Sequence, residues 1–243
     1  MTVKKEITLF WFRRDLRLND NAGLYHALKE NEHVLPLFIF DTTILEQLEN
    51  KKDRRVAFIL EALLKIKNEL EELGSSLFVF HGTPLQAFEK ITSSYSIKKV
   101  YTNHDYEPYA IKRDKHVQGF LEKKGIRLKS YKDQVIFEKN EVTKDDGLPY
   151  TVFTPYMRKW KNAFTSFYSK AYPVKKYVHH FLTCSAFPFP TLKQIGFEQT
   201  DLQFKIPIPD KKKIAVYDTQ RDFPAIEGTT HLGVHLRFGT ISI

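Results

Sequence analysis

Short apolar runs alternate with longer amphipathic segments over residues 1–131, and this alternation restricts the possible folds more than any other feature. Four of the five runs are rich in aromatic and β-branched residues, as expected of strands buried on both faces. The runs are 7–12, 34–40, 77–80, 97–101 and, more weakly, 126–131. Strands that alternate with helices through short connections form right-handed crossovers and a parallel sheet. We therefore predict an α/β, Rossmann-like domain with a doubly wound, parallel five-stranded sheet over residues 1–133.

Helix boundaries are marked by capping residues. The clearest helix should begin near Asp53, because apolar residues recur every three or four positions over residues 56–73. Gly74 follows, where a left-handed C-cap requires a residue without a Cβ. Proline comes directly after Thr83 and after Glu107, which predicts two more helix starts with proline at the first helical position.

The expected strand ends carry polar residues. In doubly wound sheets, ligands bind beyond the carboxyl ends of the strands. Those ends deliver residues 13–15, Asp41 and residues 103–107. Asp41, Asp105 and Glu107 are therefore the geometric candidates for contact with a ligand in a strand-end cleft.

The pattern changes after residue 131. Residues 171–212 mix prolines, lysines and aromatics without a sustained period, which is typical of a long connection. We predict an interdomain linker over residues 134–210, with a helix near 154–170, and the beginning of a second, helical unit over residues 211–243. The sequence stops on an apolar run inside this unit, so we expect a fragment of a longer protein.

Charge and cysteine content limit the possible partners and compartment. The formal net charge is +9. A basic surface attracts polyanions, nucleic acid foremost, although a lysine-rich solvated surface without a partner would give the same charge. One cysteine, Cys184, excludes an internal disulfide and is typical of a reducing cytosol. No apolar run is long enough to span a bilayer, and no signal-peptide cleavage site is found. We expect a cytoplasmic protein with no membrane association.

Several common catalytic motifs are absent. The chain has no GxGxxG, Walker A, HExxH or GxSxG motif, which argues against the usual dehydrogenase and hydrolase chemistry. The His179–His180 pair has no nearby carboxylates in the sequence, so we expect no metal site.

Three segments carry the strongest functional signal, and they read WFRRDLRLNDN (11–21), VFTPYMRKW (152–160) and YDTQRDFPAIEGTTHLGVHLRFG (217–239). In this order they resemble signatures of the DNA photolyase/cryptochrome family. The first also fits a buried strand followed by loop charges, and we favour a structural role for it. The second fits an amphipathic helix with Thr154 as its N-cap and Pro155 at the first helical position.

The third segment implies a flavin site. Residues 228–233 read as a turn that leads into a helix, where backbone N–H groups and two hydroxyls suit an anionic phosphate. A capped helix without a ligand is the alternative. The resemblance implies that the phosphate belongs to FAD and that the chain opens an all-α FAD-binding domain here. The implied FAD contacts are Tyr217, Thr229, Thr230, His231, Leu232 and Gly233. Family members commonly have serine at the position of Gly233, which offers only its N–H.

The resemblance also implies a contact with DNA. Arg221 matches a family arginine that contacts the DNA backbone beside a lesion, and a guanidinium can hold a phosphate through two hydrogen bonds. An ion pair of Arg221 with Asp222 or Glu227 is the competing interpretation.

By resemblance, the whole protein is a deoxyribodipyrimidine photolyase, a carbon–carbon lyase. It would bind UV-damaged DNA, turn a cyclobutane pyrimidine dimer out of the stack, as photolyases and other base-flipping enzymes do, and split it with an electron from excited, reduced FAD. Most of the flavin pocket would lie in the rest of the helical domain. We therefore expect no catalytic residue within residues 1–243, and we expect that this chain alone, a monomer, neither retains FAD nor repairs DNA.

Many relatives carry a light-harvesting antenna pigment in the strand-end cleft, which makes Asp41, Asp105 and Glu107 candidate antenna contacts. Tyr109–Ala110 stand where the best-known folate-binding relatives have an Asn–Glu pair. This leaves a deazaflavin, a second flavin, an atypical folate site or an empty cleft.

Three alternative functions stay open at this stage. A cryptochrome-type blue-light photoreceptor would share all three segments. A stand-alone nucleotide- or pigment-binding Rossmann module would have the last forty residues as an ordinary helical tail. A basic nucleic-acid-binding module without chemistry would bind DNA with an affinity that falls with salt.

Overall fold

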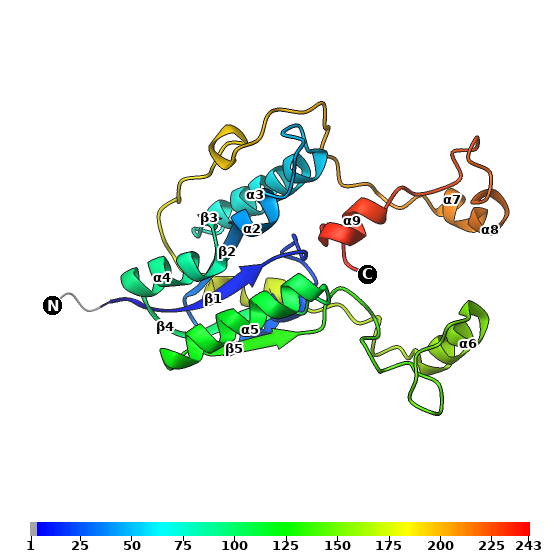
Figure 1. Ribbon diagram of the computed structural model, residues 1–243, viewed down its shortest axis with the longest axis horizontal. Helices are drawn as coiled ribbons and strands as arrows, with labels where there is room; N and C mark the ends of the chain where they lie inside the picture. Colours follow the sequence, from blue (N-terminus) through cyan, green and yellow to red (C-terminus); the bar gives the residue numbers. More distant parts are fainter. Residues whose placement is uncertain (1–3) are drawn as a thin grey trace.

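The computed structural model describes residues 4–243, so residues 1–3 of the predicted first domain lie outside the described part. Five parallel strands form one sheet in the order β3–β2–β1–β4–β5 (Figure 1). Their bounds are Glu6–Phe12 (β1), Val34–Asp41 (β2), Phe78–Gly82 (β3), Ser96–Asn103 (β4) and Arg127–Tyr131 (β5). This order confirms the doubly wound, Rossmann-like sheet predicted from the alternating pattern, and the winding reverses between β1 and β4.

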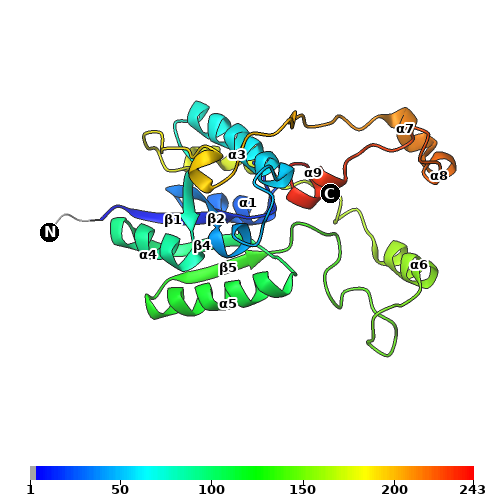
Figure 2. The same ribbon diagram turned by 45° about the horizontal axis from the view of Figure 1, so that its top comes forward.

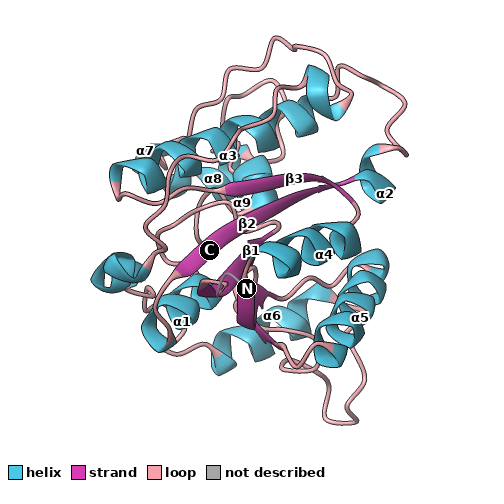
Figure 3. Ribbon diagram, turned by 90° about the vertical axis from the view of Figure 1, so that its left-hand side faces the viewer, coloured by secondary structure: helices cyan, strands magenta, loops and turns pink. Residues whose placement is uncertain are grey.

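Helices cover both faces of the sheet (Figure 3). They are α1 (Ala22–Glu30) and α3 (Arg54–Glu72) on one face and α4 (Pro84–Ser94) and α5 (Pro108–Lys123) on the other, with the short α2 (Thr42–Leu45) after β2. Side chains of β1 alternate between two cores. Phe10 and Phe12 pack with α1 and α3, whereas Leu9 and Trp11 pack with α4 and α5. The central strand is therefore buried on both sides, as its apolar run predicts.

The predicted helix boundaries of this domain are confirmed. The Asp53 carboxylate accepts a hydrogen bond from the N–H of Arg55 at 2.8 Å, and Gly74 ends α3 with φ of 75°. Thr83 and Gln86, on either side of Pro84, form a reciprocal capping box at the start of α4. Local sequence thus determines where these helices begin and end.

A cluster around Glu30 ties the end of α1 to β4 and β5. The Glu30 carboxylate accepts hydrogen bonds from Lys129 Nζ at 2.7 Å and from the Tyr101 hydroxyl at 2.8 Å. Partial burial favours the neutral acid, but these hydrogen bonds outweigh it and lower the pKa of Glu30 from 4.5 to about 2.

We expect Glu30 to stabilise the fold only while it is ionised. Because its pKa is lower in the folded state than in the unfolded chain, the contribution is complete above pH 4.5 and is lost as the pH falls through about 2. In urea denaturation, Glu30→Gln should be less stable than the wild type near neutral pH, and this difference should shrink as the pH is lowered. Glu61→Gln, at an exposed position on α3, is the matched control. A Glu30→Gln effect that does not change with pH would contradict the assignment.

The helix of the second motif differs from the expectation. It is α6, Phe153–Ala163, whereas a helix near 154–170 was expected. Its N-cap is Val152 and no side chain caps it, so the prediction of Thr154 as N-cap was wrong. The chain becomes extended at Phe164, and turns follow in which the carbonyls of Thr165 and Ser166 accept hydrogen bonds.

The segment predicted as a linker also packs on the domain. It contains two 3₁₀ helices, η1 (Val174–His180) and η2 (Lys193–Ile195). Its apolar side chains Val174, Phe181, Leu192, Ile195 and Phe197 are buried in the core on the α1–α3 side. The N–H of Leu182 donates to the carbonyl of Val34 at the start of β2, at 2.9 Å. The apolar residues of this segment show no regular spacing because the chain follows an irregular path. Their burial shows that the segment nevertheless packs on the α/β domain.

Three short helices follow, as the return of helical sequence at Lys211 predicts. They are α7 (Lys211–Ala215), α8 (Tyr217–Gln220) and α9 (Gly233–Phe238). Figures 1 and 2 show α6, α7 and α8 standing away from the sheet, whereas α9 returns to the carboxyl ends of the strands. None of the helices described for residues 4–243 is long and apolar enough to cross a lipid bilayer.

Candidate functional site

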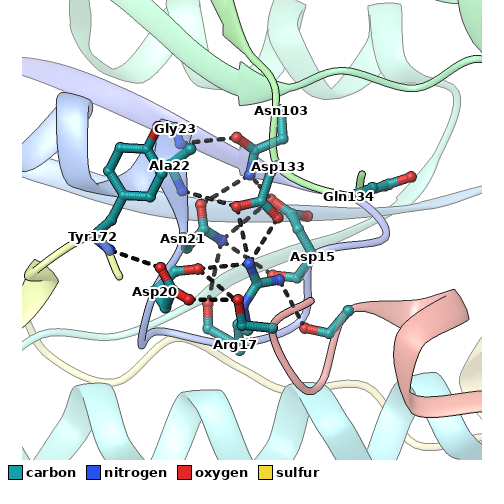
Figure 4. Close-up of polar contacts among 12 residues, drawn as sticks. Asp15, Arg17, Asp20, Asn21, Ala22, Gly23, Asn103, Asp133, Gln134 and Tyr172 are labelled. Carbon is teal, nitrogen blue, oxygen red and sulfur yellow. Dashed lines mark hydrogen bonds and ion pairs between the residues drawn. The ribbon is translucent and has the colours of Figure 1, made fainter. Parts of the chain in front are cut away.

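A buried polar network surrounds the first motif (Figure 4). Arg17 donates to both carboxylate oxygens of Asp133, at 2.9 Å each, and to the carbonyl of Gly239 at 3.2 Å. Asp133 also accepts from the N–H of Ala22, at the first residue of α1. One guanidinium therefore joins the β1–α1 loop, the segment after β5 and the end of α9.

The same network closes between β1 and β4. The Asn103 amide donates to Asp15 at 2.6 Å and to Asn21 at 2.8 Å, and its oxygen accepts from the N–H of Gly23 at 2.8 Å. Gly23 must be glycine, because an added Cβ would lie 2.7 Å from the Asn103 oxygen. These contacts give the WFRRDLRLNDN segment the structural role favoured from its sequence.

A cavity of about 480 Å³ lies beyond the carboxyl ends of β1 and β2. All three antenna candidates from the sequence, Asp41, Asp105 and Glu107, line it. The Asp41 carboxylate caps α2 through the N–H of Thr43 and accepts a hydrogen bond from the Tyr109 hydroxyl at 2.6 Å. The strand-end rule thus located the cavity, although its carboxylates already have partners within the chain.

On one side of this cavity, two arginine side chains lie next to the ring of Trp11. The guanidinium carbons of Arg13 and Arg113 lie 5.1 and 5.0 Å from the centre of the Trp11 ring. Burial lowers the pKa of Arg13, opposed by its ion pair with Asp114. Arg113 was not named as a candidate from the sequence, and Tyr109 was noted only as a departure from the folate-binding pair, although their spacing of four places both on one side of α5.

Glu107 holds two of the lining arginines. Its Oε1 accepts from Arg14 Nη1 and from Arg237 Nη2, each at 2.6 Å. The hydrogen bond from Arg237 lowers the pKa of Glu107, and the charge of Arg14 adds to this effect against partial burial. Glu107 is therefore an ionised bridge between the β1 end and α9.

The predicted flavin residues lie on two connected pieces of chain. The turn 229–233 leads into α9, and Tyr217 lies on α8. Gly228, just before the turn, packs closely against α8. A Cβ added there would lie 2.7 Å from the Cβ of Gln220. Among the described residues, no hydrogen bond is found for the Thr229 and Thr230 hydroxyls or for the backbone N–H groups of 229–232.

The surroundings of this turn differ from the expectation in one respect. Helix α9 has six residues and no side-chain cap, so its macrodipole is small and the donors themselves carry most of the attraction for an anion. His231 has φ of 53°, and its Nε2 lies 3.1 Å from Glu227. His231 and Gly233 of the turn are exposed, and Tyr217 on α8 is 46% exposed.

Arg221 lies beside this turn on an exposed surface. Its guanidinium packs over the Tyr217 ring, with 5.7 Å between the guanidinium carbon and the ring centre. Its Nε lies 3.7 Å from Asp222, as in the competing ion-pair interpretation. Both groups are about half or more exposed, so water screens this pair and the guanidinium can exchange partners.

Within residues 4–243, no group of three or more His, Cys, Asp or Glu side chains could hold a metal ion. The fold is a doubly wound α/β fold, and its cavity is lined by the ends of β1 and β2 and by the segment after β4, next to the point where the winding of the sheet reverses.

Comparisons with known proteins identify the family. The model of the DNA photolyase family matches residues 8–176. A deoxyribodipyrimidine photo-lyase of Synechococcus is 32% identical, over 97% of this chain and 51% of its own length. The chain belongs to the DNA photolyase family, and it spans about half the length of the curated photo-lyases that it matches.

Solved structures show the same fold. A bacterial class III photolyase from Agrobacterium tumefaciens has a TM-score of 0.79 and 23% identity, over 100% of this chain and 52% of that one. An archaeal photolyase from Sulfolobus tokodaii with two FAD molecules has a TM-score of 0.71 and 26% identity, over 98% of this chain and 53% of that one.

Proposed function

We propose that the whole protein is a deoxyribodipyrimidine photolyase, which uses light to split cyclobutane pyrimidine dimers in UV-damaged DNA. The observation that carries the proposal is the match to photo-lyases across 97% of this chain. Of the three segments that resemble family signatures, two have proposed roles: the first holds the β1–α1 loop to β4 and to the segment after β5, and the third presents the flavin turn and Arg221.

The turn at 229–233 fits the diphosphate of FAD. Thr229 and Thr230 offer hydroxyls and N–H groups without partners in the described chain, and Gly233 offers its N–H. His231 and Leu232 continue the lining, and Tyr217 lies beside it on α8. When bound, FAD supplies the light-driven electron transfer. The residues of this turn bind and orient its phosphates, and the exposed face of the turn leaves the rest of the cofactor to other parts of the protein.

Arg221 is the proposed contact with DNA. The pair with Asp222 is 3.7 Å long and exposed, so a DNA phosphate that accepts two hydrogen bonds from the guanidinium can replace it. The formal net charge of +9 adds a general attraction for the polyanion.

The strand-end cavity is the proposed antenna site. Its walls are mostly apolar and aromatic, and Arg14, Arg55 and Arg237 border it. This combination suits a planar aromatic pigment that carries an anionic group, as a flavin, deazaflavin or folate does. Asp41 orients Tyr109 in its wall, and Asp105 lies near Arg14 at 3.8 Å.

We also propose that the chain divides functionally as the sequence suggests. Residues 1–133 form the antenna-type domain, 134–210 connect the domains, and 211–243 begin the all-α FAD-binding domain. The proposed protein acts as a cytoplasmic monomer and uses no metal.

The test compares the 243-residue chain with the intact gene product. The chain alone is expected to lose FAD on desalting and to leave dimer-containing oligonucleotides unrepaired under blue light, because the open turn offers few contacts. The intact gene product should stay yellow and restore the oligonucleotides. A colourless intact protein would overturn the proposal, and a yellow protein without repair would indicate a cryptochrome-type photoreceptor. Repair by the 243-residue chain itself would refute the expected division of the flavin site.

A further inference from the structure

Helix α9 contacts both candidate sites at once. Its side chains Val234, Arg237 and Phe238 line the strand-end cavity, and the turn 229–233 leads directly into it. Figure 1 shows α9 lying across the carboxyl ends of the strands, whereas α7 and α8 stand away from the body. The position of this six-residue helix therefore bears on the cavity and on the turn together.

Backbone contacts attach the end of α9 to the loop after β1. The N–H of Leu16 donates to the carbonyl of Phe238 at 3.0 Å, and Arg17 donates to the carbonyl of Gly239. Gly239 has φ of 65°, and a Cβ there would lie 2.3 Å from the carbonyl oxygen of Arg14. Since that neighbour is backbone and cannot rotate away, only glycine allows this close approach.

Side chains attach the two ends of α9. Near its start, the buried His235 bonds to the Thr240 hydroxyl at 2.7 Å and packs on Phe58 of α3, with 5.2 Å between ring centres. Toward its end, Arg237 binds Glu107, which also accepts from Arg14. Because Glu107 already holds two guanidinium groups, its position is explained without a pigment.

We propose that α9 is a single rigid connection that closes the strand-end cavity and positions the turn 229–233, and that Gly239 and Glu107 are the positioning residues that fix it. Displacing α9 then opens the cavity and frees the turn in one step. The identity of the ligand at the turn rests on the proposed function, whereas the docking of α9 does not.

This arrangement couples the two sites. A ligand that fills the cavity contacts Val234 and Phe238 and so favours the docked position of α9, which restricts the turn. By thermodynamic linkage, a ligand that orders the turn favours the closed cavity to the same extent.

The experiment uses the full chain and two readouts that need no flavin. Hydrogen exchange of the amides of Leu236, Gly239 and Thr240, whose N–H groups are hydrogen-bonded in and just after α9, reports the docking of α9. Acrylamide quenching of Trp11, in a Trp160→Phe background, reports access to the cavity, which Trp11 lines with only 2% of its surface exposed.

Gly239→Ala is compared with Gly119→Ala, where an added Cβ meets nothing within 4 Å. Glu107→Gln is compared with Asp145→Asn, which breaks the exposed pair with Lys159.

In Gly239→Ala, exchange of these three amides should rise about tenfold or more, because a Cβ at this left-handed, closely packed backbone position displaces α9. The quenching of Trp11 should rise with it. In Glu107→Gln both readouts should rise about threefold, the scale of a half-exposed ion pair. Both control variants should match the wild type in both readouts.

Faster exchange without greater quenching of Trp11 would overturn the proposal, because α9 would then not close the cavity. Unchanged readouts in a folded Gly239→Ala protein would overturn it as well. If Gly239→Ala does not fold, Glu107→Gln decides by the same two readouts. If both readouts rise together while the intact gene product proves colourless, the docking of α9 stands and the proposed flavin function fails.

Discussion

Replacing Arg17 with methionine is expected to lower the free energy of unfolding by about 3 kcal/mol, the scale for leaving a buried charge without its partner. The Asp133 side chain is 2% exposed and accepts two hydrogen bonds from Arg17. Methionine preserves much of the side-chain volume, so the loss reports the missing guanidinium rather than a cavity. Urea denaturation monitored by circular dichroism measures it.

The matched control for this variant is Arg127→Met. Arg127 is exposed at the start of β5, and no ion pair is found for it among the described residues. Its replacement should change the free energy of unfolding by less than about 0.5 kcal/mol. If the two variants proved equally stable, the network in Figure 4 would not be the anchor of the first motif.

The second large effect concerns the proposed flavin turn. In the intact gene product, Thr229→Val together with Thr230→Val should weaken FAD retention by at least about tenfold. Valine keeps the shape of threonine but removes hydroxyls that would each donate to a charged phosphate, and such hydrogen bonds contribute about 1.5–3 kcal/mol. The flavin absorbance that remains after dialysis, measured against protein concentration, gives the result.

Thr219→Val provides the matched control for the threonine pair. The Thr219 hydroxyl donates to the carbonyl of Val216, the N-cap of α8, at 2.9 Å, and is not part of the turn. This variant should retain flavin as the wild type does. Equal retention by the double variant and the control would remove these two hydroxyls from the flavin site.

Local signals were sufficient to predict the sheet and most helix ends. The apolar runs fixed all five strands, and Gly74 and the Thr83–Pro84 pair marked helix boundaries through backbone geometry that only neighbouring residues determine. The strand-end rule then located the cavity, because the topology of a doubly wound sheet places the carboxyl ends of its strands at one edge.

Long-range contacts could not be predicted in the same way. Nothing near Gly239 in the sequence indicates that its backbone lies against Arg14, and nothing near Phe181 indicates that it enters the core beside α1. The N-terminus of α6 was mispredicted for a different, local reason: the helix begins after Val152, which has no side chain that could cap it. The assignments of Tyr217, Arg221 and residues 229–233 to ligands come from the family and stay predictions.

The bond from Arg17 to Gly239 joins positions 222 residues apart. A chain growing from its amino end can complete the five-stranded sheet long before the partner of Arg17 emerges from the ribosome. Closing so large a loop costs more entropy than forming any neighbouring strand pair, which makes the docking of α9 a late event in folding. During synthesis, the strand-end cavity therefore exists first without the wall that α9 contributes.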